Sequence, residues 1–89
     1  MMNSDYEKVL NIFIKHYKEL DLIDLVTKIG YTPPIRISRF KELLGITDND
    51  KFIKEFNRLC EKGLLRVVDV WVYPGHKLAP QFKKMKKLE

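Results

Sequence analysis

The chain has 89 residues with a single cysteine, a net charge of +5 and a hydrophobic fraction of 45%. This length allows one domain with a modest core, and one cysteine excludes an internal disulfide framework. No apolar run approaches the ~20 residues that cross a bilayer, and no secretory segment is recognisable. We therefore expect a single-domain cytoplasmic protein without a membrane partner.

The positive charge is concentrated in the later part of the chain. Residues 1–30 contain four lysines and five acidic residues, whereas residues 31–89 contain thirteen basic and seven acidic residues. A field of this sign attracts polyanions such as DNA, RNA or acidic proteins.

The N-terminal part predicts a helix of about four turns. Ser4 and Glu7 form a capping box, and apolar residues recur at helical spacing at Tyr6, Val9, Leu10, Phe13, Tyr17 and Leu20. Ile12 and Ile14 lie off this stripe, so the helix is either buried on more than one side or offers a second apolar face to a partner. We expect a homodimer with Ile12 and Ile14 at its interface.

A second helical stretch follows and ends at Gly30, a good left-handed stop. Asp21 either caps a separate short helix or continues the first one. Residues 31–34 contain Pro33 and Pro34 and are not helical. Residues 35–37 alternate like a short strand. Ser38 is then a candidate N-cap for a helix that ends at Gly45.

The next helix is expected from about residue 50 to residue 62, with one apolar face made by Phe52, Ile53, Phe56, Leu59 and Cys60. After Gly63, residues 64–73 are rich in β-branched residues and predict a strand. Pro74-Gly75 is a turn pair, residues 76–79 are expected to return as a second strand, and a terminal helix is expected from Pro80. Val67, Val70 and Val72 are expected to cover the helices. Trp71 and Tyr73 are either buried with them or available to stack on a base or sugar, so the orientation of Trp71 is left open.

This order of elements resembles the winged helix-turn-helix superfamily, over residues 35–89. The segments that carry the resemblance are FKELLGI (residues 40–46), FIKEFNRLCEKGLLRV (residues 52–67) and KLAPQFKKM (residues 77–85). The resemblance implies an α+β winged helix-turn-helix: one or two N-terminal helices over residues 4–30, a helix-turn-helix, a β-hairpin wing and a short C-terminal helix.

The resemblance also implies double-stranded DNA as partner, with the third helix in the major groove and the wing on the backbone. Asn57 and Arg58 have the chemistry to read base edges, and the lysines suit phosphates. The residues expected to contact DNA are Arg39, Lys51, Lys54, Asn57, Arg58, Lys62, Arg66, His76 and Lys77, with His76 and Lys77 at the tip of the wing. A small transcriptional regulator is the function expected from this set.

Two other functions remain open. Asp48 and Asp50 place negative charge at the helix end that approaches DNA in the family, and the preceding turn is about one residue longer than the common pattern. Both features favour a winged helix that contacts a protein, such as an accessory subunit of a replication, transcription or repair complex. RNA binding is a third interpretation, although the usual aromatic RNA-binding motifs are missing.

Catalytic and metal-binding patterns are not found. The two serines are explained as helix caps, Cys60 falls on an apolar helix face, and His16 and His76 have no neighbouring ligands at metal-binding spacing. We expect neither an enzyme nor a cofactor or metal.

Overall fold

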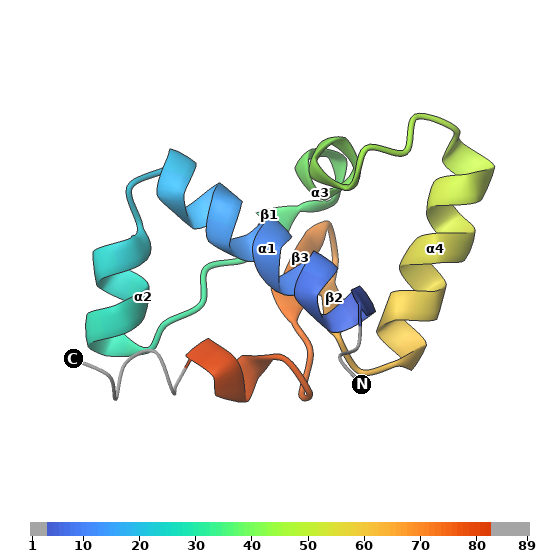
Figure 1. The fold of residues 1–89 in the computed structure, drawn as a ribbon. Helices are drawn as coiled ribbons and strands as arrows, with labels where there is room; N and C mark the ends of the chain where they lie inside the picture. The colour runs from blue at the N-terminus through green and yellow to red at the C-terminus, as the bar shows by residue number, and fades with distance from the viewer. Residues whose placement is uncertain (1–3, 83–89) are drawn as a thin grey trace.

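The computed structural model describes residues 4–82 and has an α+β fold (Figure 1). Four helices, α1 (Ser4–Glu19), α2 (Ile23–Ile29), α3 (Ile37–Leu44) and α4 (Asn49–Glu61), precede or flank a small sheet. Its strands are β1 (Ile35–Arg36), β2 (Leu65–Val68) and β3 (Trp71–Pro74). They form an antiparallel sheet in the order β1-β3-β2, and a helical turn begins at residue 79.

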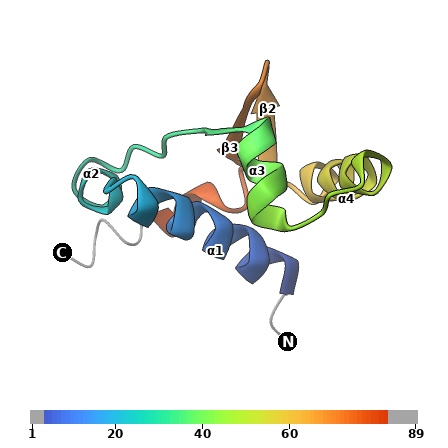
Figure 2. The ribbon, with the colours of Figure 1, turned by 90° about the horizontal axis from the view of Figure 1, so that it is seen from above.

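The arrangement places α1 across the middle of the molecule, with α2 on one side and α4 on the other (Figure 1). The β2–β3 hairpin rises away from α1, beside α3 (Figure 2). No helix within residues 4–82 has the length and apolar character to span a membrane.

The expected helices at the N-terminus are confirmed, and they are two separate helices. Asp21 has a positive φ of 56°, and the Leu22 amide donates to the Tyr17 carbonyl at 2.7 Å. A left-handed residue ends the regular helix, so the chain turns before α2 begins. Gly30 and Gly45 end α2 and α3 in left-handed conformations, as their positions predict.

Ser38 is not the N-cap of α3, so that prediction is wrong. The N-cap position is Arg36 and the helix begins at Ile37, two residues earlier than a cap at Ser38 implies, and β1 is only two residues long. The Ile37 amide donates to the Val70 carbonyl in the hairpin at 2.9 Å. The first amides of a helix have no partner within the helix. Here the hairpin accepts from one of them, so that amide does not need a side-chain cap.

The hairpin turn is also misplaced in the sequence-based interpretation. The register pairs Val68 with Trp71, so the turn is Asp69-Val70, where Asp69 has a positive φ of 57°. Aspartate tolerates this conformation better than most residues. Residues 76–78 form a turn and residue 79 begins a helix, so the expected return strand over residues 76–79 is not present. The described part of the expected terminal helix is residues 79–82, and the remainder of that expected helix lies outside the described residues.

Pro74 and Gly75 have a different role from the expected turn. Pro74 is the last residue of β3 and faces Leu65. The Gly75 amide donates to the Leu64 carbonyl at 2.9 Å, and the Lys77 amide donates to the Gly63 carbonyl at 3.0 Å. These bonds hold the end of the hairpin close to Gly63 and Leu64, which follow α4.

The core is built around aromatic rings from several elements. Phe13 of α1 lies 6.0–6.3 Å, centroid to centroid, from the rings of Tyr17, Phe40 and Phe82. The Tyr17 hydroxyl donates to the Pro33 carbonyl at 2.8 Å and so ties the proline segment to α1. Burial raises the pKa of this phenol.

Ile12 and Ile14 are accounted for within the chain. Ile12 is only 7% exposed and belongs to the core, and Ile14 is partly buried against it. The helix is therefore buried on more than one side, and Ile12 lies in the core of the chain rather than on a free face, while the homodimer stays a prediction. In the hairpin, Val72 is buried as expected, but Val67 and Val70 are exposed.

Candidate nucleic-acid interface

Helix α4 presents a mixed polar face to solvent. The Asp48 carboxylate caps the helix by accepting from the Lys51 amide at 3.1 Å, while Phe52, Phe56 and Leu59 are buried. The exposed positions are Asn49, Asp50, Lys51, Ile53, Lys54, Asn57 and Glu61. Three of the predicted DNA contacts, Lys51, Lys54 and Asn57, are therefore open to a partner, between acidic residues at both ends.

Arg58 and Lys62 instead join α4 to α1. The Arg58 guanidinium contacts both Asp5 oxygens, at 2.6 and 3.0 Å, and Lys62 Nζ lies 2.5 Å from Asp5 Oδ2. Glu55 bridges Arg58 at 2.6 Å and Lys8 at 3.2 Å. Arg58, and then Lys62, hold the pKa of the Asp5 carboxyl well below its usual range. Both cations are therefore neutralised within the chain. A base could accept hydrogen bonds from Arg58 only in competition with the Asp5 carboxylate.

Arg39 is engaged in a similar way. This α3 side chain pairs with Glu42 at 3.0 Å and with Glu19 of α1. Hydrogen bonding to Glu42, with the field of Glu19, raises the pKa of the guanidinium. Arg39 thus connects α1 and α3, and its charge is neutralised by carboxylates of the same chain.

His76 and Lys77 are exposed but do not lie at the tip of the hairpin, because the tip is Asp69-Val70. They follow β3 in the turn that packs on Gly63. An added Cβ at Gly63 would lie 2.6 Å from His76 Cε1. The sequence placed these two residues at the tip because it placed the turn at Pro74-Gly75.

Arg66 lies on the sheet together with Arg36, a residue that the sequence analysis did not single out. Its guanidinium carbon lies 4.6 Å from the ring centroid of Tyr73, and that of Arg36 lies 5.1 Å from the ring centroid of Trp71. Trp71 is 38% exposed, so it faces outward. The signal available in the sequence was the alternation of Trp71 and Tyr73, which puts both on one face of a strand.

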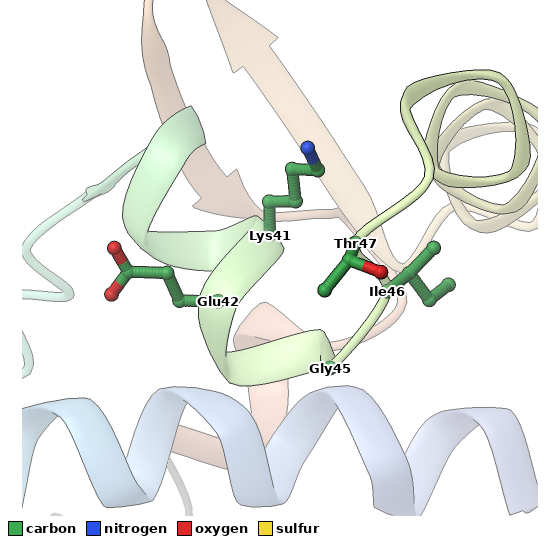
Figure 3. A pocket seen from close by; sticks show the side chains of 5 residues that line it. All are labelled: Lys41, Glu42, Gly45, Ile46 and Thr47. Atoms are coloured by element: carbon green, nitrogen blue, oxygen red, sulfur yellow. The ribbon is translucent and has the colours of Figure 1, made fainter.

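A hollow of about 270 Å³ lies at the turn between α3 and α4. Figure 3 shows that Lys41 borders the space near Thr47 and Ile46, while Glu42 points away from Thr47. The volume is below the usual range of small-molecule sites, and Lys41 Nζ already contacts the Asn49 carboxamide. Within residues 4–82, no three His, Cys, Asp or Glu side chains are grouped to hold a metal ion.

Cys60 is partly buried on α4, and burial raises the pKa of its thiol. The raised pKa disfavours the thiolate, which is the reactive form of a cysteine. The side chain thus acts as a small apolar residue.

His16 is the one described residue with a buried side-chain nitrogen, Nδ1, that has no hydrogen-bond partner. Burial lowers the pKa of this imidazole, and the nearby Arg39 lowers it further, while Glu19 acts in the opposite direction. The folded protein therefore disfavours the charged form of His16.

A pH dependence of stability follows from this shift. As the pH is lowered, the unfolded chain, in which His16 has an ordinary pKa of 6.5, binds a proton at a higher pH than the folded chain does. We therefore expect the free energy of unfolding to decrease as the pH is lowered from 7.5 to 5.5. His16→Gln is expected to reduce that fall and the matched variant His76→Gln to keep it, as measured by urea denaturation. Equal pH dependence in His16→Gln and the unsubstituted chain would contradict the assignment.

Comparison of the chain with family models, curated proteins and solved structures finds no match in any of the three.

Proposed function

We propose that this chain is a winged-helix protein that binds double-stranded DNA, with the exposed face of α4 in the major groove, and that it serves as a small transcriptional regulator. The observation that carries the proposal is the order β1-α3-α4-β2-β3 with sheet order β1-β3-β2. This layout is compatible with a helix-turn-helix followed by a wing. It leaves both the outer side of α4 and the hairpin open.

The residues of α4 suit this role in part. Lys51 and Lys54 are exposed cations for phosphates, and Asn57 can pair with the edge of an adenine. Arg58 and Lys62 contribute less, because Asp5 holds both. Residues 4–82 contain thirteen basic and eleven acidic residues, so binding by this part of the chain depends on where its cations lie rather than on their excess.

Fluorescence-anisotropy titration with a random-sequence duplex tests the proposal, at low and at near-physiological salt. We expect micromolar binding at low salt that weakens steeply as salt rises, because phosphate contacts release counterions. Lys54→Ala is expected to reduce the slope of log K against log salt by about 0.9, the value for one phosphate contact. Lys28→Ala, an exposed lysine of α2, is the matched control.

Two outcomes would contradict DNA binding through α4. One is no binding at low salt by a protein of net charge +5. The other is an equal loss of affinity in Lys54→Ala and Lys28→Ala, which would indicate a diffuse attraction rather than a site.

A protein-interaction role is the second candidate, and the exposed valines of the hairpin favour it. Val67, Val68 and Val70 are all exposed around the Asp69 turn, and a tip of this kind suits an apolar partner better than a phosphate backbone. If duplex binding is absent, we expect Val70→Lys to abolish capture of the partner protein and Lys54→Ala to leave it unchanged.

A further inference from the structure

The four arginines of the chain fall into two classes. Arg39 and Arg58 pair with carboxylates. Arg36 and Arg66 have no ion pair within residues 4–82, and each guanidinium instead lies over an aromatic ring, at 5.1 and 4.6 Å from the ring centroid. A ring face attracts a cation by about 0.5–1 kcal/mol at an exposed site. Each ring therefore holds its guanidinium in place without neutralising it.

The strand register brings both pairs to the same face of the sheet. Arg36 of β1 and Val68 of β2 face Trp71 from its two sides, and Arg66 of β2 faces Tyr73. Trp71 and Tyr73 are two residues apart on β3, so they point to the same side. We call this surface the outer sheet face: Arg36, Arg66, Val68, Trp71 and Tyr73. All five are at least partly exposed.

The electrostatics of the outer sheet face are cationic. Strands β1, β2 and β3 contain no carboxylate, and the closest acidic residue in sequence is Asp69 in the turn. In contrast, the cations at the α1–α4 contact are paired with the carboxylates of Asp5 and Glu55. The sheet thus presents two uncompensated guanidiniums beside two rings.

We propose that the outer sheet face binds a single-stranded nucleic acid, DNA or RNA, by stacking unpaired bases on the Trp71–Arg36 and Tyr73–Arg66 pairs. The donor edges of both guanidiniums take the adjacent phosphates. Base stacking on aromatic rings and on guanidinium planes, with cations along the backbone, is how proteins hold unpaired strands. The proposal goes beyond duplex binding by α4 and does not depend on it.

The spacing favours a single strand over a duplex. Trp71 and Tyr73 are separated by about 6.8 Å, from two residues at the rise of an antiparallel strand. This is about twice the 3.4 Å between bases along one strand of a duplex, and it suits two successive bases of an extended strand. In a duplex the flat faces of the bases are already stacked on each other, so no base face is accessible to the rings of Trp71 and Tyr73.

Tryptophan fluorescence gives a direct test, because Trp71 is the only tryptophan of the chain. The full chain is titrated in parallel with oligo-dT and oligo-U of about 15 nucleotides, the range of single-strand sites, and with polyglutamate as a polyanion without bases. We expect saturable quenching of Trp71 by oligo-dT, oligo-U or both, and a preference between them identifies DNA or RNA as the source. Polyglutamate is expected to have no effect on this signal.

The variants separate stacking from general attraction. Arg36→Ala and Arg66→Ala are each expected to weaken the quenching titration about tenfold, while Lys28→Ala changes it less than twofold. Tyr73→Leu keeps an apolar side chain and removes the ring, so it tests stacking if an arginine variant proves unstable by circular dichroism. Folded Tyr73→Leu that binds like the unsubstituted chain would overturn the proposal.

Absence of quenching by both oligonucleotides, or equal quenching by polyglutamate, would also overturn it. The result is distinguishable from the duplex experiment. A chain that binds single strands through the sheet but ignores duplex refutes only the role of α4, and the reverse result refutes only the role of the sheet.

Discussion

Gly75→Ala is expected to destabilise the protein severely, with a decrease in the free energy of unfolding of about 3 kcal/mol or more. A Cβ at position 75 would lie 2.2 Å from the Gly63 carbonyl oxygen, 2.7 Å from its carbon and 2.8 Å from the Leu64 carbonyl carbon. All three are backbone atoms at the junction of α4 and β2, where the Gly75 amide donates to Leu64. No side-chain rotation can relieve the clash, so the end of the hairpin must move away from α4.

Thermal denaturation followed by circular dichroism measures this effect. We expect Gly75→Ala to lower the Tm by at least about 12 °C, since 1 kcal/mol corresponds to roughly 4–8 °C in a domain of this size. Gly45→Ala is the matched control. Gly45 has a φ of 80° and no atom within 4 Å of an added Cβ, so it incurs only the left-handed strain of about 1–2 kcal/mol. A Gly75→Ala chain that is more stable than Gly45→Ala would show that the two backbone segments are not in close contact.

Leu59→Ala is expected to decrease the free energy of unfolding by about 2–5 kcal/mol. Leu59 is fully buried, on the side of α4 that joins the core. Removing its methyl groups leaves a cavity in the core that the surrounding structure fills only in part. Urea denaturation at pH 7 measures the change.

Ile53→Ala provides the comparison, because the sequence assigns Ile53 and Leu59 to one apolar face of the same helix. In the fold, 53% of Ile53 is exposed, and a surface substitution of this kind changes stability by about 0.5 kcal/mol or less. Similar losses in the two variants would mean that α4 is rotated relative to the fold described above.

The hairpin illustrates why local signals were insufficient there. Pro-Gly is a stronger turn signal than Asp-Val by composition, and it led to a turn five residues too late. The structure places the turn at Asp69 because the strands then pair Val72 with Ile35 and Val67, and it buries Val72 in the core. Gly75 is needed for a close approach of two backbones, which no local pattern distinguishes from a turn.

The predicted DNA contacts illustrate the same limit for a site. Helical spacing correctly placed Lys51, Lys54 and Asn57 on the solvent side of α4. It could not show that Arg58 lies beside Asp5, 53 residues earlier in the chain. It also could not show that Arg36 and Arg66, which are distant in sequence, occupy one face of the sheet with Trp71 and Tyr73.

The sequence by itself determined the extents of the helices to within a residue or two, because apolar periodicity and left-handed glycine stops act within one or two turns of chain. It also determined that the chain is an α+β domain with its basic residues gathered late. Only the tertiary structure decided where the hairpin turns, which of the off-stripe isoleucines are buried, and which cations are left without a carboxylate. Each of these depends on contacts between residues far apart in the chain, where strand register and side-chain pairing are selected by burial of the whole core rather than by neighbouring residues.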